Sequence, residues 1–595
     1  MYFVRLTGVI NCQVAGHMYI SSAGRPLSSQ CSQLKNYHLK SIRSRSEHTT
    51  TSNLITNKAM PGRKKQLHHK SNKAKHQPHQ RAEKNGNGKQ SQSEKQYANG
   101  PTPDPGPFRI AQSEVYGRYL VANRQLEAGE LLITEEPLVI GPCVSGDSVC
   151  LGCYQPVGLG RDQFRCPGCG WPLCEASCPG LGRRVGHTTE ECALYGERRP
   201  AFAELLSDRT SPSSVRDLYE LVMVVRILLM RTHAPEQFAL IARMESHTEE
   251  RRKNAALWSH YEQNVVGRLR DEWKLGDLAS EEGARSVHEI CGILDVNCFE
   301  IGQKGAKART LYPSAFLLAH DCSPNTAHTD DPRSFAILLR TSRRVRENEA
   351  LTLSYAYTLQ GTLKRRSFMY EGKLFWCRCR RCADPQELGS DCSAIVCRAC
   401  QQGTVRAVAP LEQTADWACD RCDHQTKVLD LERQMDHINN DLEAIDVHDI
   451  PGLENFLVRY RKTLRPNHYL LLSAKFSLCQ IYGRIKGYLL PEMSHQDIVR
   501  KERYCREFLA IIDLLEPGLT RLRGLIMYEL HAPVMVLAQM GLQSGQISRP
   551  DFQRRVKEVA KLLQNSRDIL LLEPEGSSEH EMGLAAADAF SKMGL

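Results

Sequence analysis

The alternation of apolar and polar residues predicts a small sheet that begins near Phe108. Residues 117–140, GRYLVANRQLEAGELLITEEPLVI, alternate at a period of two, which is typical of half-buried strands. Residues 128–130 within this stretch are expected to form a turn between two strands. The strand pattern resumes near Asp295 and runs to about Tyr357, so the sheet sequence is divided into two separate stretches.

Helical periodicity fills the rest of the ordered chain. Residues 198–290 include VRDLYELVMVVRILLM, with apolar residues three and four positions apart. The chain after Leu429 also has helical periodicity, as in residues 468–485 and 527–542. Paired amphipathic helices of this length predict an all-α C-terminal domain that resembles TPR repeats. No run of about 18 apolar residues occurs, so no membrane span is expected.

The charge is concentrated at the N-terminus. Residues 1–105 contain 17 Lys/Arg and 4 Asp/Glu, whereas the remaining residues contain 61 and 64 and are nearly neutral. The first segment is rich in small and polar residues and is expected to be a disordered basic tail. A neutral body argues against a nucleic-acid-binding core, so nucleic acid would be bound only weakly through the tail, if at all. The run at 63–65 suggests a nuclear address, and we expect a nuclear and cytoplasmic location.

The 23 cysteines occur mostly in short C-x2-C and C-x3-C pairs, which favours metal ligation in a reducing compartment. Residues 150–192 carry eight such ligands, and interleaved shells would hold two structural zinc ions. One predicted shell contains Cys150, Cys153, Cys174 and Cys178, and the other contains Cys166, Cys169, His187 and Cys192.

Two further cysteine groups follow the second strand stretch. Cys377, Cys379 and Cys382 supply three thiolates and need a distant fourth ligand. Cys397 and Cys400 with Cys419 and Cys422 have the spacing of a zinc ribbon and can close a site by themselves. Cys392 is a spare thiol that could compete with Cys397.

Several motifs together resemble the SMYD family of SET and MYND domain-containing proteins. They are GRYLVA at 117–122, the eight-ligand group, LYPSAFLLAHDCSPNT at 311–326 and ENEALTLSYAY at 347–357. The resemblance runs from about residue 108 to 595. The motif HDCSPN and the added ribbon are most similar to the arthropod-type SmydA/msta branch. The resemblance implies an α+β multidomain fold in which a MYND zinc finger and a helical insert split the SET β-fold.

The implied organisation is given by these ranges: 1–105, disordered tail; 106–149, SET N-terminal part; 150–192, MYND finger; 193–290, helical insert; 291–376, SET C-terminal part; 377–428, post-SET zinc site and ribbon-like insert; 429–595, helical domain. The resemblance makes Cys322 the fourth ligand of the post-SET ion. The chain would then hold two zinc ions in the MYND finger, one post-SET zinc and one in the ribbon.

The resemblance also implies S-adenosylmethionine as methyl donor. Backbone around Gly117 and Arg118 would approach its methionine part, while Asn297 and His320 would bind its amino-acid and adenine-side groups. Phe375 would stack on the adenine, and Tyr355 would direct its hydroxyl into the methyl-transfer pore as the catalytic residue.

Three positions depart from the family pattern. Ala319 replaces an asparagine, Tyr119 replaces the second glycine of the approach loop, and Lys373 replaces a second pore tyrosine. Two interpretations therefore remain open. One is a protein-lysine methyltransferase acting on histones or other proteins with accessible lysines, in transcriptional regulation. The other is a weak or inactive adaptor or corepressor whose MYND finger binds proline-containing peptides.

Overall fold

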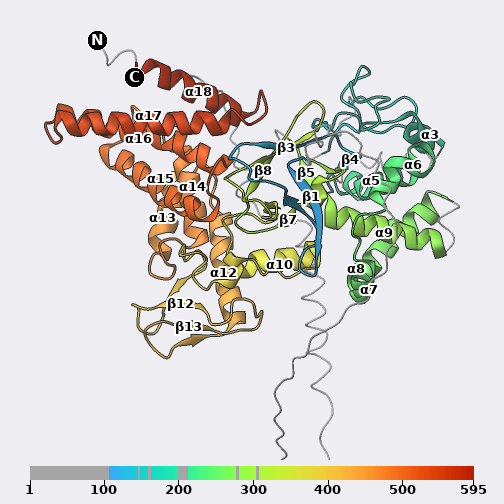
Figure 1. Ribbon diagram of the computed structural model, residues 1–595, viewed down its shortest axis with the longest axis horizontal. Helices are drawn as coiled ribbons and strands as arrows, with labels where there is room; N and C mark the ends of the chain where they lie inside the picture. The colour runs from blue at the N-terminus through green and yellow to red at the C-terminus, as the bar shows by residue number, and fades with distance from the viewer. Residues whose placement is uncertain are drawn as a thin grey trace, which may run out of the picture. The chain divides into compact units, whose positions relative to one another are not determined.

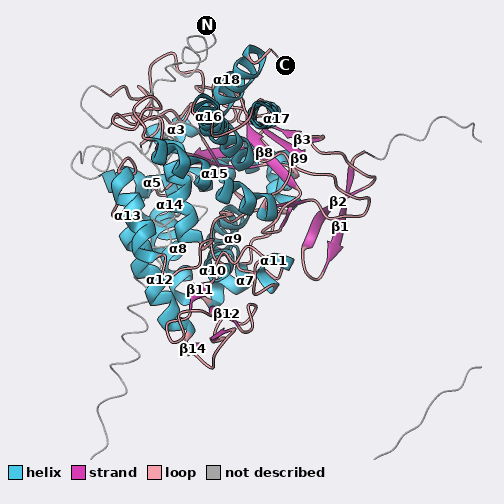
Figure 2. Cartoon of the chain, turned by 90° about the vertical axis from the view of Figure 1, so that its left-hand side faces the viewer, coloured by secondary structure: helices cyan, strands magenta, loops and turns pink. Residues whose placement is uncertain are grey.

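The computed structural model describes residues 106–144, 148–158, 163–197, 212–275, 281–302 and 307–594. The segment 1–105, for which the composition predicts disorder, lies outside the described residues. Within the described part the protein is a mixture of short strands and helices (Figures 1 and 2).

The first part of the fold is a set of short-stranded sheets. Two of them join strands from the two sequence stretches: the orders are β3-β9-β8 and β4-β6-β5, all antiparallel. A separate hairpin joins β1 to β2, and a short parallel pair joins β7 to β10. The strands are β1 (Phe108–Ser113), β2 (Gly117–Ala122), β3 (Leu131–Glu135), β4 (Val139–Pro142), β5 (Phe299–Ile301), β6 (Ala308–Leu311), β7 (Ala319–His320), β8 (Thr326–Asp330), β9 (Ile337–Thr341) and β10 (Thr352–Leu353).

The predicted turn at 128–130 is present between β2 and β3. Gly129 has a φ of +86°, a left-handed conformation that glycine adopts without steric cost, and its N–H donates to the carbonyl of Thr341 at 2.8 Å. Leu120, Ile133 and Leu339 are buried in one apolar cluster. Burial alternates along β9, as expected for a half-buried strand, whereas adjacent residues of β2, β3 and β4 are buried together, so the alternation predicted for 117–140 does not mark a single buried face.

Between the two strand stretches the chain forms helices that pack on the cysteine-rich segment. The long helix α5 buries an apolar run that ends near Ile227, and Trp171 stacks on Tyr219 of this helix with ring centroids 6.3 Å apart. Asn297, expected in strand sequence, is instead the last residue of α9. The elements of this region are α3 (Thr189–Glu197), α5 (Pro212–His233), α6 (Pro235–Ile241), α7 (Thr248–Lys253), α8 (Ala255–Tyr261), the π-helix η1 (Glu262–Glu272) and α9 (Glu281–Asn297).

After the strands, short elements surround the remaining cysteines. A 3-10 turn, η3 (Ala315–Leu317), precedes β7, and two helices, α10 (Thr362–Lys373) and α11 (Arg380–Ala383), follow β10. A four-stranded antiparallel sheet then has the order β11-β12-β13-β14. Its strands are β11 (Ile395–Val396), β12 (Thr404–Ala407), β13 (Trp417–Cys419) and β14 (Gln425–Thr426).

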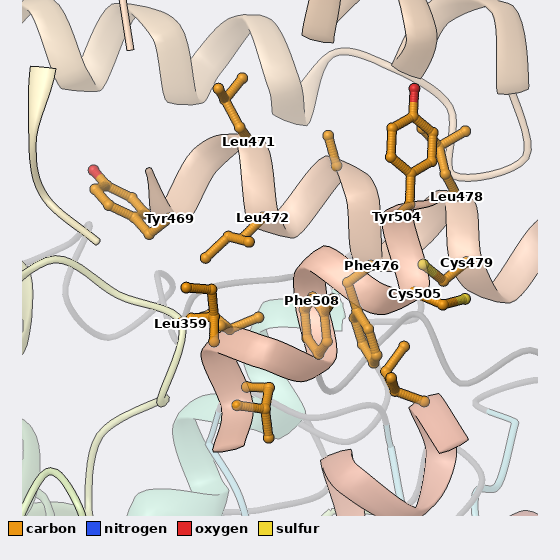
Figure 3. Packing of buried hydrophobic residues seen from close by; sticks show 14 of the residues in the cluster. Leu359, Tyr469, Leu471, Leu472, Phe476, Leu478, Cys479, Tyr504, Cys505 and Phe508 are labelled. Atoms are coloured by element: carbon orange, nitrogen blue, oxygen red, sulfur yellow. The ribbon is translucent and has the colours of Figure 1, made fainter. Parts of the chain in front are cut away.

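The C-terminal part is all helical, as its periodicity predicts, and the successive helices α14 to α17 lie side by side (Figure 1). Phe476 and Phe508 stack at 4.8 Å in its core, beside Cys479 and Cys505 (Figure 3). The helices are α12 (Val428–Glu443), α13 (Ile450–Tyr460), α14 (Tyr469–Ile481), α15 (His495–Leu515), α16 (Arg521–Gln543), α17 (Arg549–Leu570) and α18 (Ser578–Lys592).

Two of these helices show how local sequence sets the boundaries. The helical pattern predicted for 468–485 stops at Ile481, because Tyr482 is extended (φ −58°, ψ 129°) and Gly483 has a φ of +89°. Helix α16 is long and apolar enough to cross a membrane by length and composition alone. It packs between α15 and α17 and buries Glu529, so its apolar residues belong to the helical core.

Candidate functional site

The structure brings together the four cysteine-rich groups that the sequence predicts. In each group the four ligand atoms lie within 4.8 Å of one another, so each group can hold a metal ion. Tetrahedral zinc with Zn–S bonds of about 2.3 Å requires sulfur atoms about 3.8 Å apart. The sulfur pairs that are in contact measure 3.5 to 3.9 Å. The donor set and its spacing therefore fit zinc.

The two shells at 150–192 pair as expected. Cys150 lies 3.6 Å from Cys178, Cys153 lies 3.6 Å from Cys174, and Cys166 lies 3.5 Å from Cys192. His187 completes the second shell: its Nε2 is 3.3 Å from the sulfur of Cys169.

A buried ion pair supports His187 from behind. The Nδ1 of His187 is 2.8 Å from a carboxylate oxygen of Glu191, and that carboxylate accepts two hydrogen bonds from Arg226, at 2.8 and 2.9 Å. All three side chains are buried. The arginine beside it holds the pKa of Glu191 below its usual range against the effect of burial. An ionised carboxylate at Nδ1 keeps the proton there and leaves Nε2 free to bind metal.

We predict that Glu191→Gln weakens zinc binding at this shell by about ten- to a hundredfold, because a neutral amide no longer orients His187 as a ligand. Zinc release to a chelating dye measures the change. Glu190→Gln is the matched control, since Glu190 is the exposed neighbour on the same helix. Identical release curves for the two variants would contradict the assignment.

The third group joins distant parts of the chain. The sulfur of Cys322, which follows β7, is 3.9 Å from that of Cys377 and 3.6 Å from that of Cys382. Cys379 completes the group. Cys322 and the 377–382 segment, which are far apart in sequence, are thus close enough to bind the same metal ion.

Buried cations lie around this group, and sequence reasoning did not identify them. Arg365 is fully buried, and its guanidinium donates to Glu387 at 2.8 Å and to the sulfur of Cys382 at 3.6 Å. Arg381, also fully buried, contacts Glu387 at 3.2 Å and donates to the carbonyl of Thr358 at 2.9 Å. Zinc bound by four thiolates carries a net charge of about −2 and Glu387 adds a third negative charge, so these two guanidinium groups offset most of the local charge.

The fourth group lies in the small sheet β11–β14. Cys397 is 3.7 Å from Cys422, and Cys400 is 3.8 Å from Cys419. Cys392 belongs to none of the groups found among the described residues. It is fully buried, which raises its pKa to about 12, and it lies apart from the group that contains Cys397.

The residues assigned to the methyl donor by resemblance gather beside the third group. His320 lies in β7, where its Nδ1 accepts the N–H of Tyr355 at 3.0 Å. Its Nε2 therefore carries the proton and donates to the sulfur of Cys322 at 3.2 Å. His320, which the resemblance assigns to the methyl donor, is thus hydrogen-bonded to Cys322, a candidate metal ligand.

An aromatic wall forms around this histidine. Its ring lies 5.1 Å from that of Tyr355 and 6.0 Å from that of Phe375. The hydroxyl of Tyr355 donates to the carbonyl of Leu318, and burial raises its pKa well above the usual range, so it stays protonated. Asn297 is buried, and its amide donates to the carbonyls of Glu245 and Ile293, both at 2.8 Å.

The β1–β2 hairpin places the approach-loop residues. Gly117 has a φ of +64° and open space where a Cβ would stand. Arg118 reaches over the ring of Phe316 at 5.9 Å and donates to the carbonyl of Arg243. The ring of Tyr119 lies 5.2 Å from that of Tyr116. The backbone at Gly117 is therefore accessible, and the side chain of Tyr119 is accommodated by another aromatic ring.

Two departures from the family pattern have visible local consequences. Ala319 is buried and pairs with Thr352 of β10, so a methyl group stands where an amide is usual. Lys373 ends α10, and its Nζ donates to the carbonyls of Asp295 and Val296 at 3.0 and 2.7 Å. The same amine lies 5.9 Å from the ring centre of Tyr355. Burial lowers the pKa of Lys373.

These residues fit S-adenosylmethionine in most respects. The aromatic rings of His320, Tyr355 and Phe375 converge, and the backbone at Gly117 is open. Two features differ. Two carbonyl acceptors at the end of α9 already bind the ammonium of Lys373, and the amide of Asn297 already donates to the carbonyls of Glu245 and Ile293.

Comparisons with known proteins find relatives that contain SET domains or are named as lysine methyltransferases. The SET domain-containing protein SmydA-8, isoform B, of Drosophila melanogaster is 29% identical over 451 residues, which cover 72% of this chain and 92% of that protein. The histone-lysine N-methyltransferase ATXR4 of Arabidopsis thaliana is 25% identical over 47% of this chain and 86% of that protein. The histone-lysine N-methyltransferase SMYD3 of Mus musculus is 26% identical over 45% of this chain and 59% of that protein. No family model matches the chain.

The fold and the four Cys/His groups define a mixed α/β protein with candidate zinc sites, similar to SET-type lysine methyltransferases. More narrowly, the resemblance to the SMYD family and its SmydA branch is confirmed by these relatives.

Proposed function

We propose that the chain is a protein-lysine methyltransferase that takes its methyl group from S-adenosylmethionine. The observation that carries this proposal is the direct contact of Tyr355, His320 and the Cys322 group, because it places a partly buried phenol beside a candidate metal group. In this proposal the sheets form a SET domain, residues 150–192 form a MYND finger, and each of the four Cys/His groups holds one structural zinc ion.

A cavity of about 1540 Å³ lies between the strands and the C-terminal helices. Ser354 and Ala356 line it, but Tyr355, His320 and Phe375 do not, so in this proposal it is a docking surface for the substrate protein and not the reaction site itself. Ten Asp and Glu side chains line it, against five Lys and Arg. This excess of negative charge favours a basic, lysine-containing segment, such as a histone tail.

The chemistry requires alignment and desolvation more than acid or base groups. S-adenosylmethionine supplies an electrophilic methyl group on a sulfonium. The substrate amine must be neutral to attack it, and the partly apolar surroundings of Tyr355 and Phe375 favour the neutral amine. The hydroxyl of Tyr355, fixed on the carbonyl of Leu318, orients the reacting groups.

The test is to incubate the zinc-loaded protein with isotopically labelled S-adenosylmethionine and to measure the transfer of label to histones and to the proteins of a cell extract. We expect Tyr355→Phe to lower the rate by about a hundredfold, because misaligned reactants react that much more slowly, while donor binding measured by calorimetry stays within a few fold. Tyr370→Phe is the control, since Tyr370 is exposed and stacks only on Trp376. Absence of donor binding at millimolar concentration would defeat the proposal.

The second candidate function is a non-catalytic adaptor or corepressor. The observation that favours it is Lys373, whose ammonium occupies acceptors inside the candidate donor site. The MYND finger would then capture proline-containing peptides while the SET fold serves as a scaffold. Labelled-donor transfer that is lost in Tyr355→Phe would exclude this role. A nuclear and cytoplasmic location and a role in transcription belong to both proposals.

A further inference from the structure

The C-terminal end of α9 binds a cation next to residues that the resemblance assigns to the methyl donor. The last carbonyls of a helix lack partners within the helix and carry the negative end of its dipole. Here the carbonyls of Asp295 and Val296 point to the same ammonium, that of Lys373, at 3.0 and 2.7 Å. The next residue, Asn297, is one that the resemblance assigns to the amino-acid part of the donor.

The third side of the site is an aromatic face. The Nζ of Lys373 is 5.9 Å from the centre of the Tyr355 ring, a distance at which a cation is attracted to the ring. Carbonyl oxygens and an aromatic face are the groups that would also attract a cationic ligand. The ammonium of Lys373 therefore occupies a place that would otherwise suit a cationic ligand.

We propose that Lys373 is an internal cation that competes with the positive charge of the methyl donor and sets a low affinity for it. This inference rests on the proposed function and deepens it. S-adenosylmethionine carries a positive sulfur, whereas its product, S-adenosylhomocysteine, carries a neutral thioether. The ammonium of Lys373 must therefore weaken the binding of the donor more than that of the product.

Electrostatics sets the expected size of the effect. For an illustrative separation of about 6 Å between two unit positive charges, at an effective dielectric constant near 20, the repulsion changes an equilibrium by about a hundredfold. Since solvent and local motion screen part of this repulsion, we expect at least a tenfold gain in donor affinity when the charge is removed. The product should gain about threefold or less.

The structural alternative is that Lys373 only caps α9, and the variants are chosen to separate the two roles. Lys373→Gln keeps a donor for the α9 carbonyls and removes the charge, whereas Lys373→Arg keeps both the donor and the charge. Lys557→Gln is the control for the substitution itself, since Lys557 is exposed on α17. Thermal unfolding of each zinc-loaded full-length variant shows whether it is folded.

The experiment is calorimetric titration of each protein with S-adenosylmethionine and with S-adenosylhomocysteine. We expect Lys373→Gln to bind the donor at least tenfold more tightly than wild type, and Lys373→Arg and Lys557→Gln to resemble wild type. If wild type binds the donor and Lys373→Gln binds it no more tightly, the inference is overturned and the proposed function stands. If no variant binds either ligand, both are overturned. If Lys373→Gln unfolds, wild-type protein that binds S-adenosylmethionine as tightly as S-adenosylhomocysteine would overturn the inference.

Discussion

Cys322→Ala should release one zinc ion per chain and cost several kcal/mol of stability, because three ligands from a single short segment cannot hold the metal as four do. Its sulfur bridges β7 to the 377–382 segment and accepts a hydrogen bond from His320. The binding free energy of a structural zinc ion, about 10 to 16 kcal/mol in small peptides, contributes directly to folding. The loss should also remove donor binding, since His320 and Phe375 lose their common anchor.

Zinc content by mass spectrometry and the midpoint of thermal unfolding measure this effect. Cys143→Ala is the matched control, because Cys143 is also buried but belongs to none of the candidate metal groups in the described part of the chain. An unchanged metal content in Cys322→Ala, with a melting temperature equal to that of the control, would show that the third group is not a metal site.

Arg365→Met should destabilise the protein by about 3 to 5 kcal/mol, since it removes one member of a fully buried charge network. Arg365 neutralises Glu387 and the thiolate of Cys382 at the same time. Methionine fills similar volume but leaves these negative groups with Arg381 as their nearest buried cation. Stability should therefore fall although the apolar packing is retained.

Denaturant unfolding of the zinc-loaded protein gives this free energy. Arg380→Met removes the same charge from an exposed position on α11 and should change stability by less than about 0.5 kcal/mol. Equal midpoints for the two variants would mean that the buried guanidinium is not required to balance the metal group.

The Cys322 group and the Arg365 network differ in how far the sequence alone could predict them. The grouping of the cysteines could be predicted because C-x2-C spacing is a local geometric requirement of a tetrahedral metal shell. Cys322 is not close in sequence to its partners, and only the resemblance assigned it to the 377–382 group. The divided strand pattern likewise indicated two stretches of sheet, but not that β3 would pair with β9.

The supporting polar residues could not be predicted, and the reason is physical. Long side chains such as Arg226, Arg365 and Lys373 reach partners that tertiary packing brings near, so their sequence neighbours carry no information about those partners. A weak local signal exists only for Glu191, which follows His187 by four residues at the start of a helix. The sequence identified Lys373 as a departure from the family pattern, but it did not predict that the α9 carbonyls would accept its hydrogen bonds.

Because the sheet sequence is divided, strands that are synthesised early must wait for partners that are synthesised late. Strands β3 and β4 leave the ribosome long before their partners β9 and β6, so their edges stay open during the synthesis of roughly 200 residues. The intervening thiolates can acquire metal during that delay and compact the insert. A cell short of zinc would thus accumulate nascent chains with unprotected strand edges, and the first symptom of scarcity would be aggregation on the way to the native state rather than a change in the folded protein.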